Sequence, residues 1–169
     1  MTIQLTPQLF DSKVQISKLE PEDFQDLYLV ASDKKIWAGH PSKDRYKRGV
    51  FKKWFDSALA SKAALKIIDI STNKIIGSTR YYDYVSGQKI AIGYTFLSRN
   101  YWGGSTNTRV KKLMFDYASQ DVKFIVFHIA PSNIRSQKAI EKLGAVFSHV
   151  ELKELSNGTE EYLCYKYSC

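Results

Sequence analysis

The chain has 169 residues, of which 44% are hydrophobic and 25% are charged. This length and balance are typical of one globular domain that buries its own core, so we treat residues 1–169 as a single domain. The net charge of +8 favours anionic partners, from nucleic acid to a polyphosphate cofactor. The basic residues are spread along the chain, which argues against a dedicated nucleic-acid-binding tail.

The sequence also lacks the marks of a membrane or secreted protein. It has no run of about 18 apolar residues, and its start lacks the charged and apolar regions of a secretion signal. The two cysteines, Cys164 and Cys169, have the spacing of neither a disulfide framework nor a zinc site. We therefore expect a cytoplasmic protein with no membrane partner and no bound metal.

Hydrophobic periodicity divides the chain into strands and helices, after a lead-in over residues 1–12. The predicted strands are 14–19, 65–70, 75–82, 90–97, 124–129, 146–155 and 161–167. Helices are predicted to begin at Glu20-Pro21, with proline and acids in the first turn, and at Ser42. A third helix follows Gly104 and continues to about residue 120. A fourth begins after Pro131-Ser132-Asn133 and ends at Gly144, which we place at the C′ position.

The resulting order is β α α β β β α β α β β. It predicts a mixed α/β (α+β) fold with a mostly antiparallel sheet of about seven strands flanked by four helices. Asn157-Gly158 predicts a tight hairpin between the last two strands.

One stretch combines a strand, a glycine turn and an amphipathic helix. The strand ends near Leu97, Gly103 and Gly104 form the turn, and an apolar stripe marks the helix that follows. A helix N-terminus preceded by glycine presents free backbone N–H groups and the positive end of the helix dipole. This stretch therefore predicts an anion-binding site, and the usual anion is a phosphate.

Three motifs, within the predicted order of strands and helices, resemble those of the GCN5-related N-acetyltransferases (GNAT). The resemblance is strongest to the ribosomal-protein-acetylating branch of that family. They are Ile92-Gly-Tyr-Thr-Phe-Leu97 with Tyr101-Trp-Gly-Gly104, Asn133-Ile-Arg-Ser136 with the helix to Ala145, and Ile75-Ile-Gly-Ser-Thr-Arg80. The resemblance covers residues 12–168. It implies a GNAT fold in which the strand 90–97 and the strand 124–129 part in a V that holds the pantetheine arm of acetyl-CoA.

The resemblance also implies which residues meet acetyl-CoA. They are Phe96, Leu97, Ser98, Trp102, Gly103, Gly104, Ser105, Thr106, Asn107, Asn133 and Ser136. The chain departs from the family pattern at Ser105, where a glycine is common, and at Arg109, where a glutamate is common. Cofactor binding survives the first departure if Ser105 has ordinary backbone angles.

For the chemistry, the resemblance implies direct acetyl transfer to a primary amine, either a protein N-terminus or a small molecule. Ser136 is the candidate partner of the departing sulfur, and Asn133 of the pantetheine. The structural alternatives are a helix cap for Asn133 and an exposed serine for Ser136.

The proton acceptor is less clear from the sequence. Glu151 and Glu154 lie on the strand after the fourth helix, and we take Glu154 as the candidate base and Tyr165 as the candidate acid. A solvated strand carboxylate and a core tyrosine are the alternatives, and a turn carboxylate, Asp83, is a further candidate.

Other polar residues have ordinary structural explanations. His128 and Cys164 fit a buried strand, whereas Trp37 and His40 lie in a loop that could touch substrate. Two other functions stay open: a CoA-binding module without activity, and a basic protein associated with nucleic acid. Pairing of two copies into a homodimer is also among the expectations.

Overall fold

The computed structural model describes residues 2–155 and 158–169. Its strands are β1 (Leu9–Phe10), β2 (Val14–Lys18), β3 (Ala64–Asp69), β4 (Lys74–Val85), β5 (Lys89–Leu97), β6 (Phe124–Ile129), β7 (Val146–Leu155) and β8 (Gly158–Ser168). Its α-helices are α1 (Phe24–Ala31), α2 (Arg48–Ala60), α3 (Thr106–Ala118) and α4 (Ile134–Glu141). Short 3-10 turns cover Pro21–Asp23, Lys34–Trp37 and Arg99–Tyr101. Within the described residues, no helix is both long and apolar enough to cross a membrane.

The strands form one sheet with the order β1-β2-β3-β4-β5-β6-β8-β7. Neighbouring strands run antiparallel except β5 and β6, which run parallel. This confirms the predicted mixed, mostly antiparallel fold with four flanking helices. The described sheet has eight strands where about seven were predicted, because Leu9 and Phe10 of the lead-in pair with β2.

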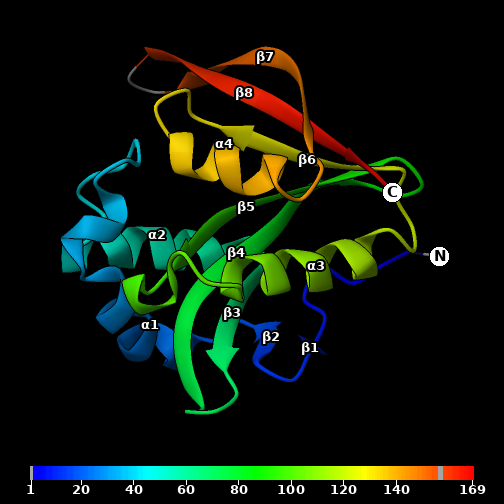
Figure 1. The fold of residues 1–169 in the computed structure, drawn as a ribbon. Helices are drawn as coiled ribbons and strands as arrows, with labels where there is room; N and C mark the ends of the chain where they lie inside the picture. Colours follow the sequence, from blue (N-terminus) through cyan, green and yellow to red (C-terminus); the bar gives the residue numbers. More distant parts are fainter. Residues whose placement is uncertain (1, 156–157) are drawn as a thin grey trace.

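Helices cover both faces of the sheet. On one face α3 packs on β4, where the Tyr81 hydroxyl donates to the Met114 carbonyl at 2.7 Å. On the other face α2 packs its Phe51 and Trp54 rings against Phe96 of β5. Figure 1 shows α3 and α4 in front of the sheet, α1 and α2 together at the left, and the β7–β8 hairpin at the top. Successive side chains of β4 and β5 therefore point to opposite faces and pack into two hydrophobic cores, one on each face.

The start of the second helix was predicted too early. Residues 42–47 form successive turns, and α2 begins at Arg48 with Lys47 as its N-cap. Within these turns the Arg45 amide donates to the Ser42 carbonyl, and the Arg45 guanidinium donates to the Ser42 hydroxyl at 3.1 Å. Serine offered a plausible helix cap, but here its hydroxyl accepts from a side chain instead of capping α2.

The end of the fourth helix was predicted correctly. The Ala145 amide donates to the Ile140 carbonyl and the Gly144 amide donates to the Glu141 carbonyl, which is the hydrogen-bond pair of a Schellman motif. Gly144 holds a φ of 93°, a value suited to glycine. The predicted Asn157-Gly158 turn falls partly on residues 156–157, which lie outside the described residues, although Leu155 and Gly158 do pair.

Candidate active site

Strands β5 and β6 part in the middle of the sheet. They pair in parallel at three positions, Lys89 with Phe124, Ile90 with Ile125 and Ala91 with Val126. Beyond these pairs β5 continues to Leu97 and β6 to Ile129. The backbone edges of β5 and β6 that face each other across this gap are thus available to a ligand. This is the V-shaped parting of the two strands that the resemblance predicts.

A bulge in β5 lies beside the gap. Arg80 pairs with Gly93 and Ser78 pairs with Phe96, so two residues of β5, Tyr94 and Thr95, oppose one residue of β4. Tyr94 has a φ of 53°, which is strained for an aromatic residue. Strain of this kind gathers at ligand sites, and here it turns the Tyr94 ring into the cavity described below.

The turn before α3 has the geometry expected of an anion site. Gly103 has a φ of 72°, a conformation that favours glycine. Ser105, the departure from the family pattern, has ordinary angles of φ −87° and ψ −6°. A serine at this position therefore needs no strained backbone. Arg109 joins the turn to the N-terminal segment, since its Nε donates to the Ser105 hydroxyl at 3.3 Å and its Nη1 to the Asp11 carboxylate at 2.8 Å.

A cavity of about 890 Å³ joins the gap to this turn. Of the residues predicted to meet acetyl-CoA, its lining contains Phe96, Leu97, Trp102, Gly103, Gly104, Asn107, Asn133 and Ser136. Ser98, Ser105 and Thr106 lie at the same turn but outside the lining. The structure thus brings most of the predicted set to one cavity.

Three side chains brace the mouth of this cavity. The Trp102 indole donates to the Leu97 carbonyl at 3.0 Å, and the Arg135 guanidinium stacks on the Trp102 ring at 3.6 Å. Asn133 caps α4, since its side chain accepts from the Ser136 amide at 3.3 Å. The capping alternative for Asn133 therefore holds, and it leaves the residue in the lining.

Tyr82 of β4, His128 of β6 and Glu151 of β7 form a chain of contacts beside the gap. The Tyr82 hydroxyl lies 2.8 Å from His128 Nδ1, and Glu151 lies 3.4 Å from His128 Nε2. Burial lowers the pKa of His128, whereas hydrogen bonding to His149 lowers the pKa of Glu151. A neutral imidazole beside a carboxylate holds its proton on Nε2, so Nδ1 accepts from the Tyr82 hydroxyl.

The two sequence candidates for acid and base lie elsewhere. Glu154 is exposed on β7 and does not line the cavity. Tyr165 is 4% exposed, and its hydroxyl donates to Glu141 of α4 at 3.1 Å, on the opposite face of the sheet from Cys164. Asp83 is likewise exposed and outside the lining.

Cross-strand pairing explains how His128 meets its partners. His128 of β6 lies opposite Cys164 of β8, which in turn lies opposite His149 of β7. One ligand atom from each of His128, Glu151 and Cys164 lies within 4.8 Å of the others. These residues show no metal-binding spacing in the sequence, because register alone brings them together.

Lys111 is a second residue that the sequence reasoning missed. It lines the cavity from α3, is 4% exposed, and donates to the Thr95 hydroxyl at 2.6 Å. Burial lowers its pKa to about 7. The signal was present in the sequence, since Lys111 precedes Met114 by three residues and Ala118 by seven, on the apolar stripe of the helix.

Of the two loop residues singled out in the sequence, His40 lines the cavity and Trp37 does not. Trp37 is buried, and its indole donates to the Ala31 carbonyl at 2.7 Å. His40 lines the cavity, and burial together with the charges of Arg45 and Arg135 lowers its pKa to about 4. His40 is therefore neutral at physiological pH.

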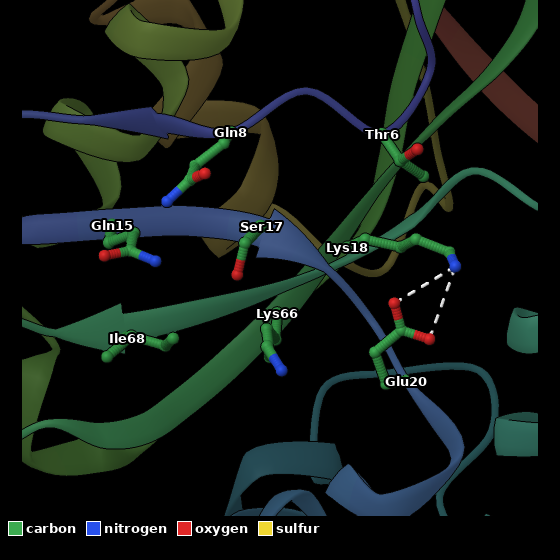
Figure 2. A pocket seen from close by; sticks show the side chains of 8 residues that line it. All are labelled: Thr6, Gln8, Gln15, Ser17, Lys18, Glu20, Lys66 and Ile68. Carbon is green, nitrogen blue, oxygen red and sulfur yellow. Dashed lines mark hydrogen bonds and ion pairs between the residues drawn. The ribbon is translucent and has the colours of Figure 1, made fainter.

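A second hollow lies on the outer part of the sheet, between the N-terminal segment, β2 and β3. Figure 2 shows its polar side chains, with the Lys18 ammonium beside the Glu20 carboxylate. Lys66 is paired with Asp23 at 2.7 Å. Both lysines of this hollow are thus neutralised by protein carboxylates, in contrast to the cations around the main cavity.

The comparisons with known proteins agree with this geometry. A family model described as "Acetyltransferase (GNAT) domain" matches residues 13–146, and no curated protein matches the chain. A GCN5-related N-acetyltransferase from Brucella melitensis is 15% identical over 96% of this chain and 79% of its own, with a TM-score of 0.84.

Two further solved structures are similar. Mycobacterium smegmatis RimJ, in complex with CoA-disulfide, is 13% identical over 97% of this chain and 87% of its own, with a TM-score of 0.69. The ribosomal-protein-S5-alanine acetyltransferase from Vibrio fischeri is 18% identical over 96% of both chains, with a TM-score of 0.69. At these identities the solved structures support the fold, and the family match covers most of the sequence. The chain belongs to the GNAT acetyltransferase family.

Proposed function

We propose that the protein is an acetyl-CoA-dependent N-acetyltransferase that transfers the acetyl group directly to a primary amine. One observation carries the proposal: a single cavity joins the gap between β5 and β6 to the glycine turn before α3. The pantetheine arm of acetyl-CoA needs an extended groove, and the pyrophosphate at its end needs an anion site. The gap and the glycine turn offer these two features side by side. The neighbour RimJ was solved with a CoA derivative, which supports the same ligand here.

The charges along the cavity suit this ligand. Free amides at the start of α3 face the turn, where a pyrophosphate gains from the helix dipole. Arg135, Lys138 and Lys142 of the α4 region line the same cavity. In our proposal they neutralise the phosphates, while Asn133 and Ser136 lie toward the pantetheine and the sulfur.

Direct transfer requires the amine to lose a proton as its nitrogen attacks the thioester carbonyl. We assign this proton to the Tyr82–His128 pair. The Tyr82 oxygen takes the proton from the amine as its own proton passes to His128 Nδ1, and Glu151 stabilises the imidazolium that forms. Tyr82 and His128 line the cavity, so this pair takes the role that the sequence reasoning gave to Glu154 and Tyr165.

Charge also develops on the leaving group. Bond formation to nitrogen breaks the carbon–sulfur bond, and the sulfur leaves as a thiolate. Lys111 adds a buried ammonium to the cavity next to β5, where no carboxylate among the described residues pairs with it. In our proposal this cation lowers the energy of the thiolate, together with Ser136.

A substitution at Gly104 tests the cofactor site. A Cβ at this position would meet nothing within 4 Å, and its φ is not positive, so a side chain fits. We expect Gly104→Asp to weaken acetyl-CoA binding at least tenfold through repulsion of the phosphates, while the carboxylate stabilises the start of α3 by about 0.3–1 kcal/mol. Calorimetric titration of acetyl-CoA measures the first effect, and urea unfolding measures the second.

Gly104→Ala is the matched control, because it adds a Cβ without charge. Equal affinity in the alanine and aspartate variants would remove the turn from the proposed cofactor site. Binding of acetyl-CoA to the wild type without release of thiol to any amine would favour the alternative of a CoA-binding module without activity.

A further inference from the structure

Three buried hydrogen-bond donors on the α2 side of the cavity have no acceptor. They are Trp54 Nε1, Arg80 Nε and Arg80 Nη2. Among the described residues, every other buried side-chain nitrogen or oxygen atom has a hydrogen-bond partner. Buried polar groups are nearly always hydrogen-bonded, since an unpaired donor costs about 1–3 kcal/mol. Three such atoms in one place therefore call for a ligand.

The three donors belong to one cluster with Arg45. The Arg80 guanidinium carbon lies 5.9 Å from the centre of the Trp54 ring, and that of Arg45 lies 5.7 Å from the same ring. Arg80 is 6% exposed, and Arg45 lines the cavity. Two guanidinium groups thus lie beside one indole ring, with Arg45 in the cavity lining and Arg80 and Trp54 buried behind it.

No protein carboxylate offsets this charge in the described contacts. Burial lowers the pKa of Arg80, and burial followed by repulsion from Arg80 lowers the pKa of Arg45 to about 10. By contrast, the partly buried Arg109 is paired with Asp11 and Lys66 with Asp23. The Arg45–Arg80 cluster therefore combines unpaired donors with positive charge, a combination that an oxyanion satisfies in both respects.

The cluster lies next to the proposed chemistry. The Tyr94 ring stacks on the Arg80 guanidinium at 4.1 Å and meets the Tyr82 ring at 5.3 Å. Tyr94 is 47% exposed at the cavity wall. A shift of this one side chain would open the Arg80 donors to the cavity, and one aromatic ring separates them from the hydroxyl assigned to accept the proton.

We propose that Trp54, Arg80 and Arg45 bind an oxyanion carried by the acceptor itself. The acceptor is then a small molecule with a primary amine and, a few bonds away, a carboxylate or phosphate. This inference rests on the proposed N-acetyltransferase function and narrows its acceptor. On this inference, a protein N-terminus with no anionic group near its amine is not a preferred substrate.

Matched pairs of amines test the proposal. Acetyl transfer is followed by thiol release for glycine against glycinamide, and for O-phosphoethanolamine against ethanolamine. We expect kcat/KM to be at least about tenfold higher for the anionic member of one pair, a ratio that charge-assisted hydrogen bonds supply. The pair with the larger ratio identifies the oxyanion as carboxylate or phosphate.

Variants locate the effect. Arg45→Gln and Arg80→Gln are each expected to remove at least about tenfold of the preference for the anionic amine while acetyl-CoA affinity stays unchanged. Arg48→Gln is the matched control, because Arg48 is exposed on α2 and bonds Gln25. Arg45 lies in a turn outside the helices, so we expect Arg45→Gln to fold normally. This variant therefore tests the inference even if Arg80→Gln fails to fold.

Direct binding separates this inference from the proposed function. Glycine and O-phosphoethanolamine are titrated by calorimetry into wild-type protein saturated with CoA. Equal transfer to charged and neutral amines, or no binding of either anionic amine to the CoA complex, would overturn the oxyanion site and point to a buried water at the donors. Failure of the wild type to bind acetyl-CoA would instead overturn the proposed function.

Discussion

Tyr82, His128 and Glu151 come from three different strands, yet they form one line of contacts that ends in the cavity. Each has a distinct electrostatic role. Burial favours the neutral imidazole, the carboxylate fixes its tautomer, and the phenol lines the cavity. An arrangement of this kind moves a proton without leaving a charge isolated in the protein.

Removing the imidazole should slow transfer without loss of the cofactor. We expect His128→Gln to lower kcat by about 100-fold or more, the usual contribution of a positioned base. The acetyl-CoA dissociation constant should not change. Steady-state kinetics and calorimetric titration measure the two quantities, and unchanged kcat would contradict the assignment. Glu154→Gln tests the sequence-based candidate in the same assay, and we expect it to change kcat little.

The pH profile gives an independent check of the same residue. A base must be neutral, and burial lowers the pKa of His128 below its ordinary value of 6.5. Activity should therefore persist to pH values under 6.5 and fall as the pH drops through the lowered pKa. In Glu151→Gln the carboxylate that raises this pKa is gone, so the acidic limb should move to lower pH. A limb that stays in place would contradict the contact.

Lys111 makes a prediction about stability. Its pKa is 10.5 when unfolded and about 7 when folded, so between these values the unfolded chain binds more protons. The free energy of unfolding therefore rises with pH in this window, with a slope of at most about 1.4 kcal/mol per pH unit. As the pH falls toward 7, burial of Lys111 destabilises the folded protein increasingly. Lys111→Met should be the more stable protein near pH 7, and the difference should shrink by pH 10.

Urea unfolding of both proteins across this pH range measures that difference. A constant gap between wild type and Lys111→Met would show that Lys111 does not titrate in the window.

At the scale of elements, local signals were readable and cross-strand relations were not. The glycine turn, the cap at Asn133 and the end of α4 at Gly144 each depend on a few neighbouring residues, and the sequence predicted them. The start of α2 at Arg48 was missed because the Ser42 hydroxyl bonds Arg45 instead of capping the helix. The contacts among Tyr82, His128 and Glu151 were missed because strand register brings distant residues together.

Gly49 inside α2 and Gly144 just past the end of α4 should respond in opposite directions to the same substitution. Gly49 lies in the first turn of α2 with open space around it, so Gly49→Ala should stabilise the protein by up to about 1 kcal/mol. Gly144 has a φ of 93°, which an L side chain rarely adopts, so Gly144→Ala should destabilise the protein by about 1–2 kcal/mol. Thermal unfolding distinguishes the two, and changes of the same sign would contradict this account of α4.

At the scale of the whole molecule, the fold places the candidate site at the break in the sheet. Two hydrophobic cores hold β4 and β5 from both faces, while β6 pairs with β5 at three positions only. The order of elements predicted this architecture, since each element could be read from its own periodicity. The buried donors of Trp54 and Arg80 could not be predicted, because their lack of partners depends on the packing of α2 against β4.

The most direct test of the central claim is a product measurement. Wild-type protein is incubated with acetyl-CoA and a primary amine, and free thiol and N-acetylated amine are quantified together by a thiol reagent and mass spectrometry. We predict that the two products form in equal amounts and only when an amine is present. Binding of acetyl-CoA with no thiol release across the matched amines would contradict the claim that this protein is an N-acetyltransferase.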